Sequence, residues 1–349
     1  MRWNVRRLMF DGPGRTRWEE VEEPELSGPA GALVRPIAVA TCDLDVAVLR
    51  GSYPLPGPYP LGHEGVAEVV AVGDEVSRVA PGDRVIVPFQ ISCGQCAPCL
   101  RGRTGNCAAH ALMSSYGLGP LGGQQWGGLL ADLVLVPHAD AMLVPLPDTL
   151  DPVAVASASD NIPDAWRTVG PGLAEDPGAE VLVVGGDAGP CSIGLYAVGI
   201  AVALGASRVV YADAGANPTR GSVAEAFGAE VIGLADAPRR KVGSFPITVD
   251  ASGTPEGLRL ALDSTALDGT CTSPSIYLTD VELPLLRMYS RGCTFVTGRA
   301  HARGTLPAVL EAFASGFDPS PVTTTVARWE DAAQALNSPS MKTVVHRTS

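Results

Sequence analysis

The sequence is poor in positive charge and contains no long apolar run. Lys and Arg number 25 against 37 Asp and Glu, so the formal net charge is −12. This balance repels phosphate backbones and anionic lipid surfaces, and we therefore expect neither a nucleic-acid nor a membrane partner. The apolar, uncharged run at residues 191–207 is shorter and richer in glycine than a membrane span, which needs about 20 apolar residues. We expect it to form a buried helix.

The N-terminal stretch MRWNVRRLMFDGPG also lacks the apolar core of a secretory signal, which leads us to expect a cytoplasmic, reducing location. In such a location, eight cysteines are more often metal ligands or core residues than a disulfide framework. The 46% of apolar residues argue against disorder. At 349 residues the chain is long enough for two domains of about 150 residues each.

The pattern of the sequence changes near residue 180. Before residue 145, short β-branched runs alternate with Gly and Pro turns, which favours an irregular, largely antiparallel β domain. From residue 180, strand-like segments such as EVLVVGG, RVVYAD and EVIGL alternate with helical ones. This alternation predicts a parallel sheet with helical crossovers. The predicted fold class is therefore α/β with a β-rich part.

Four cysteines lie close together in the segment CGQCAPCLRGRTGNC; they are Cys93, Cys96, Cys99 and Cys107. Four thiolates in one short loop can converge on a tetrahedral ion without strain, which predicts a structural zinc. An iron–sulfur cluster is the nearest alternative, but the bacterial ferredoxin run places its next cysteine after three residues and before proline. Two disulfides are the remaining alternative.

Two other segments carry residues typical of a catalytic zinc. His63 and Glu64 lie on a glycine-bounded turn in YPLGHEGVAEVV, and Cys42 lies 21 residues before His63. Because the chain has only five histidines, a catalytic zinc would combine one imidazole with thiolate and carboxylate ligands. A packing role for Cys42 stays open, whereas a cysteine nucleophile would need a nearby base that this segment does not display.

A strand, a glycine-rich turn, a helix and a second strand ending in an acid follow one another in residues 178–213. The glycine candidates for cofactor binding are Gly185, Gly186, Gly189 and Gly194. Glycines let a backbone approach a pyrophosphate, and Asp213 can bind both ribose hydroxyls. Because Asp213 would repel a 2′-phosphate, we expect NAD rather than NADP. The turn departs from GxGxxG and contains Asp187, and a simple packing turn is the alternative.

Taken together, GHEGVAEVVAVG, the four-cysteine loop and the EVLVVGG…GASRVVYAD unit resemble the zinc-containing medium-chain alcohol dehydrogenase family over essentially the whole chain. The resemblance implies a GroES-like catalytic domain at residues 1–165, completed by 290–349. It also implies a Rossmann-type, doubly wound parallel sheet domain at 166–289. Two zinc ions per chain, a small-molecule substrate and a homodimer or homotetramer would follow.

The same resemblance gives individual residues their roles. The catalytic zinc would be held by Cys42, His63 and Asp160. Asp160 stands where many members have cysteine, and is similar to the aspartate of formaldehyde dehydrogenases. Glu64 would lie behind the metal, and Asp45 would be the carboxylate that orients the His63 ring.

The resemblance implies a zinc-dependent oxidoreductase that transfers a hydride between NAD(H) and an alcohol or carbonyl. Lys342 resembles the basic residue that reaches the cofactor pyrophosphate, with a solvated lysine as the alternative. Leu44 and Ala47, however, occupy positions where the family usually has a proton-relaying hydroxyl and often a histidine. Two alternatives therefore stay open: a reductase of the same fold acting on an activated C=C or C=N bond, and a redox-inactive, zinc-stabilised binding protein.

Overall fold

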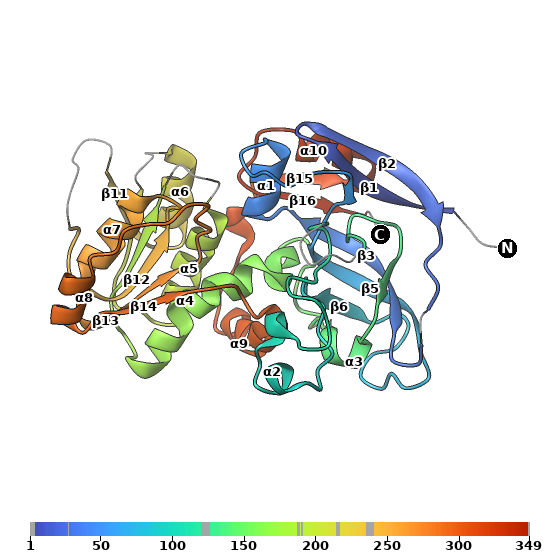
Figure 1. Cartoon of the computed structure of the whole chain (residues 1–349), viewed down its shortest axis with the longest axis horizontal. Coiled ribbons are helices and arrows are strands. Elements are labelled where there is room, and N and C mark those ends of the chain that lie inside the picture. Colours follow the sequence, from blue (N-terminus) through green and yellow to red (C-terminus); the bar gives the residue numbers. More distant parts are fainter. Residues whose placement is uncertain are drawn as a thin grey trace. The chain divides into compact units, whose positions relative to one another are not determined.

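The computed structural model forms two compact units (Figure 1). It describes residues 4–26, 28–119, 126–186, 189, 191–213, 217–234 and 241–347. Unit 1 comprises Met1–Pro163, Ala300–Pro307 and Thr323–Ser349, and unit 2 comprises Asp164–Arg299 and Ala308–Val322. Within the described residues, none of the helices has the length and apolar character needed to cross a bilayer.

Unit 1 is built on two sheets, one of three strands in the order β2-β1-β4 and one of seven strands in the order β15-β16-β3-β5-β6-β8, with β7 paired to β3. All pairs are antiparallel except β15 with β16. The strands are β1 (Asn4–Gly12), β2 (Arg15–Glu22), β3 (Ala32–Ala40), β4 (Tyr59–Pro60), β5 (Glu64–Val72), β6 (Arg84–Val87), β7 (Val134–Val136), β8 (Val144–Pro145), β15 (Thr325–Arg328) and β16 (Thr343–His346). The expected antiparallel β domain is confirmed.

Short helices connect these strands, and the C-terminal segment completes the larger sheet. The helices of unit 1 are α1 (Asp43–Leu49), α2 (Ala97–Leu100), η1 (Thr104–Asn106), α3 (Ala139–Met142), η2 (Ala156–Ser159), η4 (Trp329–Asp331) and α10 (Ala332–Leu336). Figure 1 shows β16, from the end of the chain, beside β3, from its beginning, and the two strands pair in register. The apolar run of β3 is buried along most of its length, so this strand lies at the centre of the unit's core.

Unit 2 contains a six-stranded sheet in which every neighbouring pair is parallel. Its strands are β9 (Val181–Gly185), β10 (Val209–Asp213), β11 (Glu230–Gly233), β12 (Phe245–Ala251), β13 (Thr265–Ser273) and β14 (Thr294–Thr297). The order β11-β10-β9-β12-β13-β14 is 3-2-1-4-5-6 when counted from β9. This is the order of a doubly wound dinucleotide-binding sheet, so the predicted fold class is confirmed.

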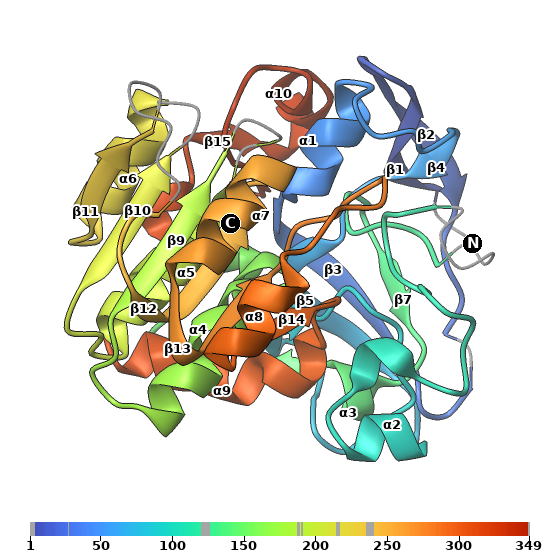
Figure 2. The same ribbon diagram turned by 60° about the vertical axis from the view of Figure 1, so that its left-hand side comes forward.

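Unit 2 also contains the helices α5 (Ser192–Ala203), α6 (Pro218–Ala226), α7 (Pro255–Ser264), α8 (Leu285–Arg291) and η3 (Ser320–Val322). The first four contact strands of the parallel sheet, and η3 contacts α5 and α6. Helices α4 (Asn161–Glu175) and α9 (Ala302–Ala314) begin in unit 1 and continue in unit 2. Figure 2 shows α5 and α7 with β9 and β12, which they contact. Almost all of α5 is buried, as predicted for the apolar run at 191–207.

The position of β14 differs from the sequence expectation. Residues 290–299 were predicted to belong with the catalytic domain, but β14 pairs in parallel with β13 and extends the sheet of unit 2. Four-residue strands that are mostly exposed, as this one is, carry little apolar pattern to reveal which sheet they join. The other predicted domain limit, at 165, stays a prediction of where the functional domains divide.

Candidate metal centres and cofactor site

Four buried side chains from three separate segments converge at the start of β5 in unit 1. They are Cys42, His63, Glu64 and Asp160, and their ligand atoms all lie within 4.8 Å of one another. Cys42 caps the N-terminus of α1, the His-Glu pair opens β5, and Asp160 follows η2. The fold therefore brings together the three predicted zinc ligands and the glutamate predicted to lie behind them.

Backbone contacts explain why these segments meet. Ala40, at the end of β3, pairs with Glu64, at the start of β5, so the chain leaves β3 beside the ligand pair of β5. The Gly65 N–H donates to Ser159 Oγ at 2.6 Å, which ties η2, and with it Asp160, to the same end of β5. These contacts thus hold residues nearly one hundred positions apart at the same end of β5.

His63 is positioned by the glycine before it and faces two carboxylates. Gly62 has a φ of +92°, and a Cβ there would lie 2.6 Å from the Leu130 backbone nitrogen, so this turn requires glycine. The ring Nδ1 lies 3.4 Å from Asp45 Oδ1, and Nε2 lies 3.4 Å from Asp160 Oδ2. Neither ring nitrogen has a hydrogen-bond partner among the described residues. Nε2 thus faces the ligand cluster, and Nδ1 faces the carboxylate predicted to orient the ring.

The electrostatics of this cluster fit a bound cation. Burial lowers the pKa of His63, but the charges of Asp45 and Asp160 outweigh burial and raise that pKa to about 9. Burial, followed by the charges of Asp160 and Glu64, raises the pKa of the Cys42 thiol. Burying several anionic groups without a compensating cation is costly. A thiolate, an imidazole and a carboxylate are the ligand types that zinc binds, so the residues present fit zinc.

Asn161 and Lys342 surround the cluster with hydrogen bonds. Asn161 Nδ2 donates to Cys42 Sγ at 3.2 Å and to Asp160 Oδ2 at 3.1 Å. The fully buried Lys342 Nζ donates to Asn161 Oδ1 at 2.7 Å and to Glu64 Oε2 at 3.0 Å. Burial raises the pKa of Glu64 to about 8, although the lysine charge opposes this.

The sequence reveals these two residues to different extents. It gives no signal for Asn161 beyond its place after Asp160. Lys342 is the residue predicted to reach the cofactor pyrophosphate, whereas in unit 1 its ammonium binds Glu64 and Asn161. The solvated-lysine alternative is wrong, because the side chain is buried. A contact with the cofactor stays a prediction.

The positions expected to lack a proton relay lie in α1. The Leu44 backbone N–H donates to Cys42 Sγ at 3.4 Å, and the Leu44 side chain packs against the apolar core of unit 1. The Ala47 carbonyl accepts a hydrogen bond from the Ser52 hydroxyl at 3.0 Å. Neither the leucine nor the alanine side chain can carry a proton, so neither could serve as a relay for a substrate beside the Cys42 cluster.

The four-cysteine loop forms a second ligand cluster, made of Cys93, Cys96, Cys99 and Cys107. None of these cysteines forms a disulfide. Cys96 and Cys107 have their sulfurs 3.9 Å apart, near the separation of about 3.8 Å that tetrahedral geometry gives for zinc–sulfur bonds of about 2.3 Å. Backbone N–H groups of Cys99 and Ala108 donate to Cys96 and lower the pKa of its thiol to about 6. The loop is therefore shaped for a zinc ion, and the disulfide alternative is wrong.

The predicted phosphate turn follows the buried strand β9 in unit 2. Its candidates are Gly185, Gly186, Gly189 and Gly194. A Cβ on Gly194 would lie 2.7 Å from the Cβ of Ala251, so this glycine lets α5 pack closely on β12. A Cβ on Gly189 would meet nothing within 4 Å, so the space beside this residue is open. The turn leads into the N-terminus of α5, where backbone N–H groups are suited to binding an anion. Asp187 lies outside the described residues.

Asp213 ends β10 opposite Gly185 of β9, at the same edge of the sheet as the turn. Its carboxylate is bound by the Arg220 guanidinium, with Nε 3.0 Å from Oδ2 and Nη2 2.8 Å from Oδ1. Both residues are buried. The sequence predicts the acid but not the arginine, because a single arginine in a helix is normally solvated.

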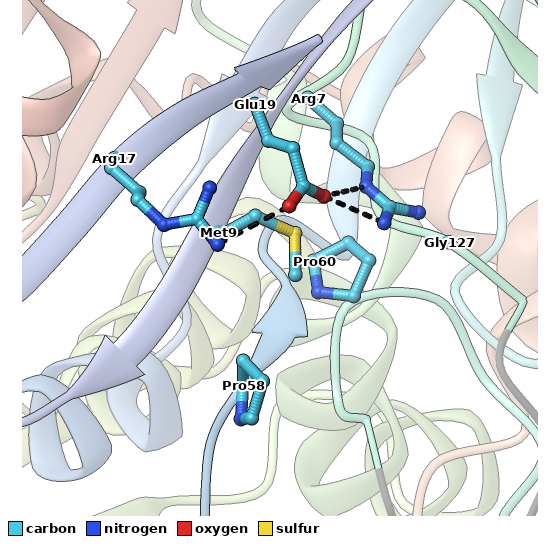
Figure 3. Close-up of a pocket in the computed structure, with 7 residues that line it drawn as sticks. All are labelled: Arg7, Met9, Arg17, Glu19, Pro58, Pro60 and Gly127. Carbon is cyan, nitrogen blue, oxygen red and sulfur yellow. Dashed lines mark hydrogen bonds and ion pairs between the residues drawn. The ribbon is translucent and has the colours of Figure 1, made fainter. Parts of the chain in front are cut away.

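A separate pocket of about 320 Å³ in unit 1 is lined largely by residues of β1, β2 and β4 (Figure 3). It is lined by Arg7, Met9, Arg17, Glu19, Pro58, Pro60 and Gly127. Arg7 Nη2 lies 2.7 Å from Glu19 Oε2 and Arg17 Nη2 lies 3.2 Å from Glu19 Oε1, so both guanidinium groups already bind a carboxylate. The pocket contains none of the predicted site residues.

Comparison with known proteins bears on both units. A family model described as an alcohol dehydrogenase GroES-like domain matches residues 28–148. The glutathione-independent formaldehyde dehydrogenase of Pseudomonas aeruginosa is 33% identical over 245 residues, which cover 66% of this chain and 58% of that protein. The chain thus spans less than two thirds of that relative's length.

This chain covers a larger share of two further relatives. The medium chain reductase/dehydrogenase ucsI of Acremonium sp. is 32% identical over 236 residues, or 66% of this chain and 76% of that protein. The solved structure of alcohol dehydrogenase TADH from Thermus sp. ATN1 is 28% identical, with a TM-score of 0.84 over 98% of this chain and 100% of that chain. With its GroES-like and parallel-sheet units and its two ligand clusters, the chain belongs to the zinc-containing medium-chain alcohol dehydrogenase family.

Proposed function

We propose that this chain is a zinc-dependent oxidoreductase that transfers a hydride between NAD(H) and an alcohol or carbonyl substrate. The observation that carries the proposal is the convergence of Cys42, His63 and Asp160 within unit 1. These three residues would hold a catalytic zinc. When bound, zinc supplies a Lewis acid that polarises a substrate oxygen. The nicotinamide supplies the hydride acceptor or donor.

The residues around the ligands would fix their orientation. Asp45 would hold the tautomer and ring plane of His63 through the Nδ1 side. Asn161, which donates to both Cys42 and Asp160, would keep these two ligands facing each other. The glutamate behind the metal would stay paired with Lys342.

The cofactor would bind at the carboxyl edge of the sheet in unit 2, where the glycine turn and Asp213 lie together. A carboxylate at this position favours NAD(H), whose ribose hydroxyls can donate to it. The eight cysteines, none of them in a disulfide, fit the cytoplasmic location that we propose.

A substrate screen with zinc-loaded protein tests the proposal. Because the Pseudomonas aeruginosa relative is named as a formaldehyde dehydrogenase, we would begin with formaldehyde and short primary alcohols. We expect turnover, followed as NADH formation, that disappears in Asp160→Ala. It should persist in Cys293→Ser, which changes a cysteine outside both clusters. Turnover that survives Asp160→Ala unchanged would contradict the proposal.

Leu44 and Ala47 support a second candidate, a reductase acting on an activated C=C or C=N bond. Alcohol oxidation releases a proton as well as a hydride, and a positioned acid or base contributes about 10²- to 10⁴-fold to such a step. Conjugate reduction needs no relay at this position, because solvent can supply the second proton. Consumption of NADH with enones but not with aldehydes would favour this candidate, and ordinary rates of alcohol oxidation would remove it.

We also propose that the chain forms a homodimer or homotetramer. In unit 2, β14 is the last strand of the sheet, and large apolar side chains are exposed on neighbouring α8. Leu286 is 82% exposed and Tyr289 is 86% exposed. A second copy could cover this apolar surface and pair with the edge strand. Light scattering should give a mass of two or four chains, reduced by Leu286→Glu; a single-chain mass in the wild type would contradict this part of the proposal.

A further inference from the structure

Two histidines of unit 1 that belong to neither ligand cluster meet through their rings. The Nε2 atoms of His110 and His138 lie 2.9 Å apart, and the ring centroids lie 5.0 Å apart. His110 follows the four-cysteine loop, whereas His138 stands directly before α3, 28 positions later. A separation of this length is not a ligand motif, so the fold reveals the pair and the sequence pattern does not.

Packing fixes the backbone around both rings. His138 is the N-cap residue of α3, where its carbonyl oxygen accepts a hydrogen bond from the Met142 N–H at 2.9 Å, but its side chain makes no capping hydrogen bond. A Cβ on Gly94 would lie 2.6 Å from the Cβ of Ala141, so the four-cysteine loop packs directly against this helix. The two Nε2 atoms are thus presented to each other by elements that are already in contact.

The contact between the rings leaves both of them able to bind a metal ion. Burial lowers the pKa of His110, and burial together with the charge of His110 lowers the pKa of His138. Both rings are therefore neutral at pH 7.5, and their contact is one hydrogen bond in which one Nε2 donates. When the donor ring carries its proton on Nδ1 instead, both Nε2 lone pairs can bind an ion and no proton is released. The hydrogen bond that is lost joins two neutral groups and adds little net stability.

The distance between the two nitrogen atoms selects the kind of metal. Imidazole nitrogens bind zinc at about 2.0–2.1 Å, and at bonds of this length two nitrogens 2.9 Å apart subtend an angle of about 90° at the ion. Tetrahedral zinc would need about 3.3 Å between the two nitrogens. Angles of about 90° between neighbouring ligands are typical of the square-planar or tetragonal sites of Cu²⁺ and Ni²⁺. Because both side chains are only partly buried, water can fill the remaining coordination positions.

We propose that His110 and His138 form a third metal site of the chain, which binds Ni²⁺ or Cu²⁺ through both Nε2 atoms. The ion would join the end of the four-cysteine loop to the start of α3, because Cys107, the last cysteine of the loop, lies three residues before His110. It would hold this end of the loop in place independently of the zinc. An ion that binds only the folded chain also raises its Tm.

Titration of zinc-loaded, untagged protein with Ni²⁺ tests the proposal; Ni²⁺ is the probe because Cu²⁺ also oxidises thiols. We expect calorimetry to show one Ni²⁺ per chain with both zinc ions retained, and Tm to rise. Trp126 lies edge-on to His110 with the ring centroids 5.2 Å apart, so Ni²⁺ should quench its fluorescence. His110→Gln should weaken Ni²⁺ binding by about 10- to 100-fold or more, because one of two ligands is lost.

His346→Gln is the matched control, since this histidine lies in β16 and outside the pair, and its variant should bind Ni²⁺ as the wild type does. His138→Gln repeats the test from the other ring if His110→Gln does not fold, and circular dichroism checks the folding of each variant. Wild-type protein that binds no Ni²⁺, or folded pair variants that bind it as tightly as the wild type, would overturn the proposal. Release of zinc in proportion to the Ni²⁺ bound would also overturn it, because the ion would then occupy one of the two ligand clusters.

Discussion

The two ligand clusters of unit 1 differ in the origin of their ligands and in their surroundings. The four-cysteine cluster comes from one loop, is partly exposed, and is held by backbone N–H groups such as that of Ala108, which donates to Cys96 at 3.3 Å. The other cluster joins residues as distant as Cys42 and Asp160, and all its members are buried. A metal ion held by one local loop is suited to stabilising the fold. Neighbouring residues can adjust the reactivity of a metal ion that is held by buried ligands of several kinds.

Unlike the four-cysteine cluster, the buried cluster is surrounded by charged side chains. Asp45 faces His63, and Lys342 is buried against Glu64. A metal ion in such a site experiences several fixed charges, which is the usual condition of a catalytic centre. The variants below should therefore affect the two clusters unequally.

The largest effect should follow from removing the imidazole of the buried cluster. We expect His63→Ala to lower kcat/KM by on the order of 10³-fold or more, because a metal charge stabilises a transition state by several kcal/mol. Steady-state kinetics on purified protein measure this change. Cys293→Ser serves as the control, because Cys293 lies outside both clusters. A comparable loss of kcat/KM in His63→Ala and Cys293→Ser would contradict a catalytic role for the buried cluster.

Removing the buried lysine should destabilise the fold. Lys342→Met leaves the Glu64 carboxylate buried without its cation, which costs about 3–5 kcal/mol in the free energy of unfolding. Urea denaturation of zinc-loaded protein measures the loss. Combining Lys342→Met with Glu64→Gln should restore most of the stability, and a single-variant loss below about 1 kcal/mol would mean that the pair is not what stabilises this cluster.

A smaller effect is expected from the carboxylate beside the imidazole. Asp45→Asn keeps an oxygen that can accept from the Cys42 N–H, as Asp45 Oδ2 does at 2.9 Å, but removes the charge facing His63. We expect zinc affinity at the buried cluster to fall by about 10- to 100-fold. Competition with a chromogenic chelator measures it, with the four-cysteine cluster as an internal reference. Equal weakening of both clusters would argue against an orienting role for Asp45.

The smallest change should appear in the thiols of the chelated, metal-free chain. Cys96, with its pKa lowered to about 6, should be thiolate at pH 7.5 and react with iodoacetamide, and its rate should fall as the pH drops below 6. Cys42, with its pKa raised by burial and by nearby carboxylates, should stay a thiol and react slowly throughout. Mass spectrometry of peptides after pulsed alkylation gives both rates, and faster labelling of Cys42 would reverse the comparison.

The contrast between the clusters also explains what the sequence could predict. The four-cysteine site was predictable from spacing alone, because one short loop supplies every ligand. The set of Cys42, His63 and Asp160 followed only from a family resemblance, since pairing of β3 with β5 brings these segments together. The contacts of Asn161 could not be predicted, because they depend on side-chain geometry created by tertiary packing.

In unit 2, too, the regular pattern was predictable from the sequence, whereas the contacts made by tertiary packing were not. Alternating strands and helices predicted its parallel sheet, and the predicted acid Asp213 does end β10 beside the glycine turn. Arg220, seven residues later, carries no motif, yet its ion pair alters the charge that the cofactor would meet. Likewise β14 is too short and too exposed for its pattern to show that it joins this sheet.

The most direct test of the account is the zinc content per chain of the wild type and two variants, Asp160→Ala and Cys99→Ala, read beside NADH binding by fluorescence. We predict two zinc ions in the wild type and one in each variant, with NADH bound by the wild type and by Asp160→Ala. A single zinc in the wild type that Asp160→Ala leaves unchanged would contradict the account, because the four-cysteine loop would then be the only metal site.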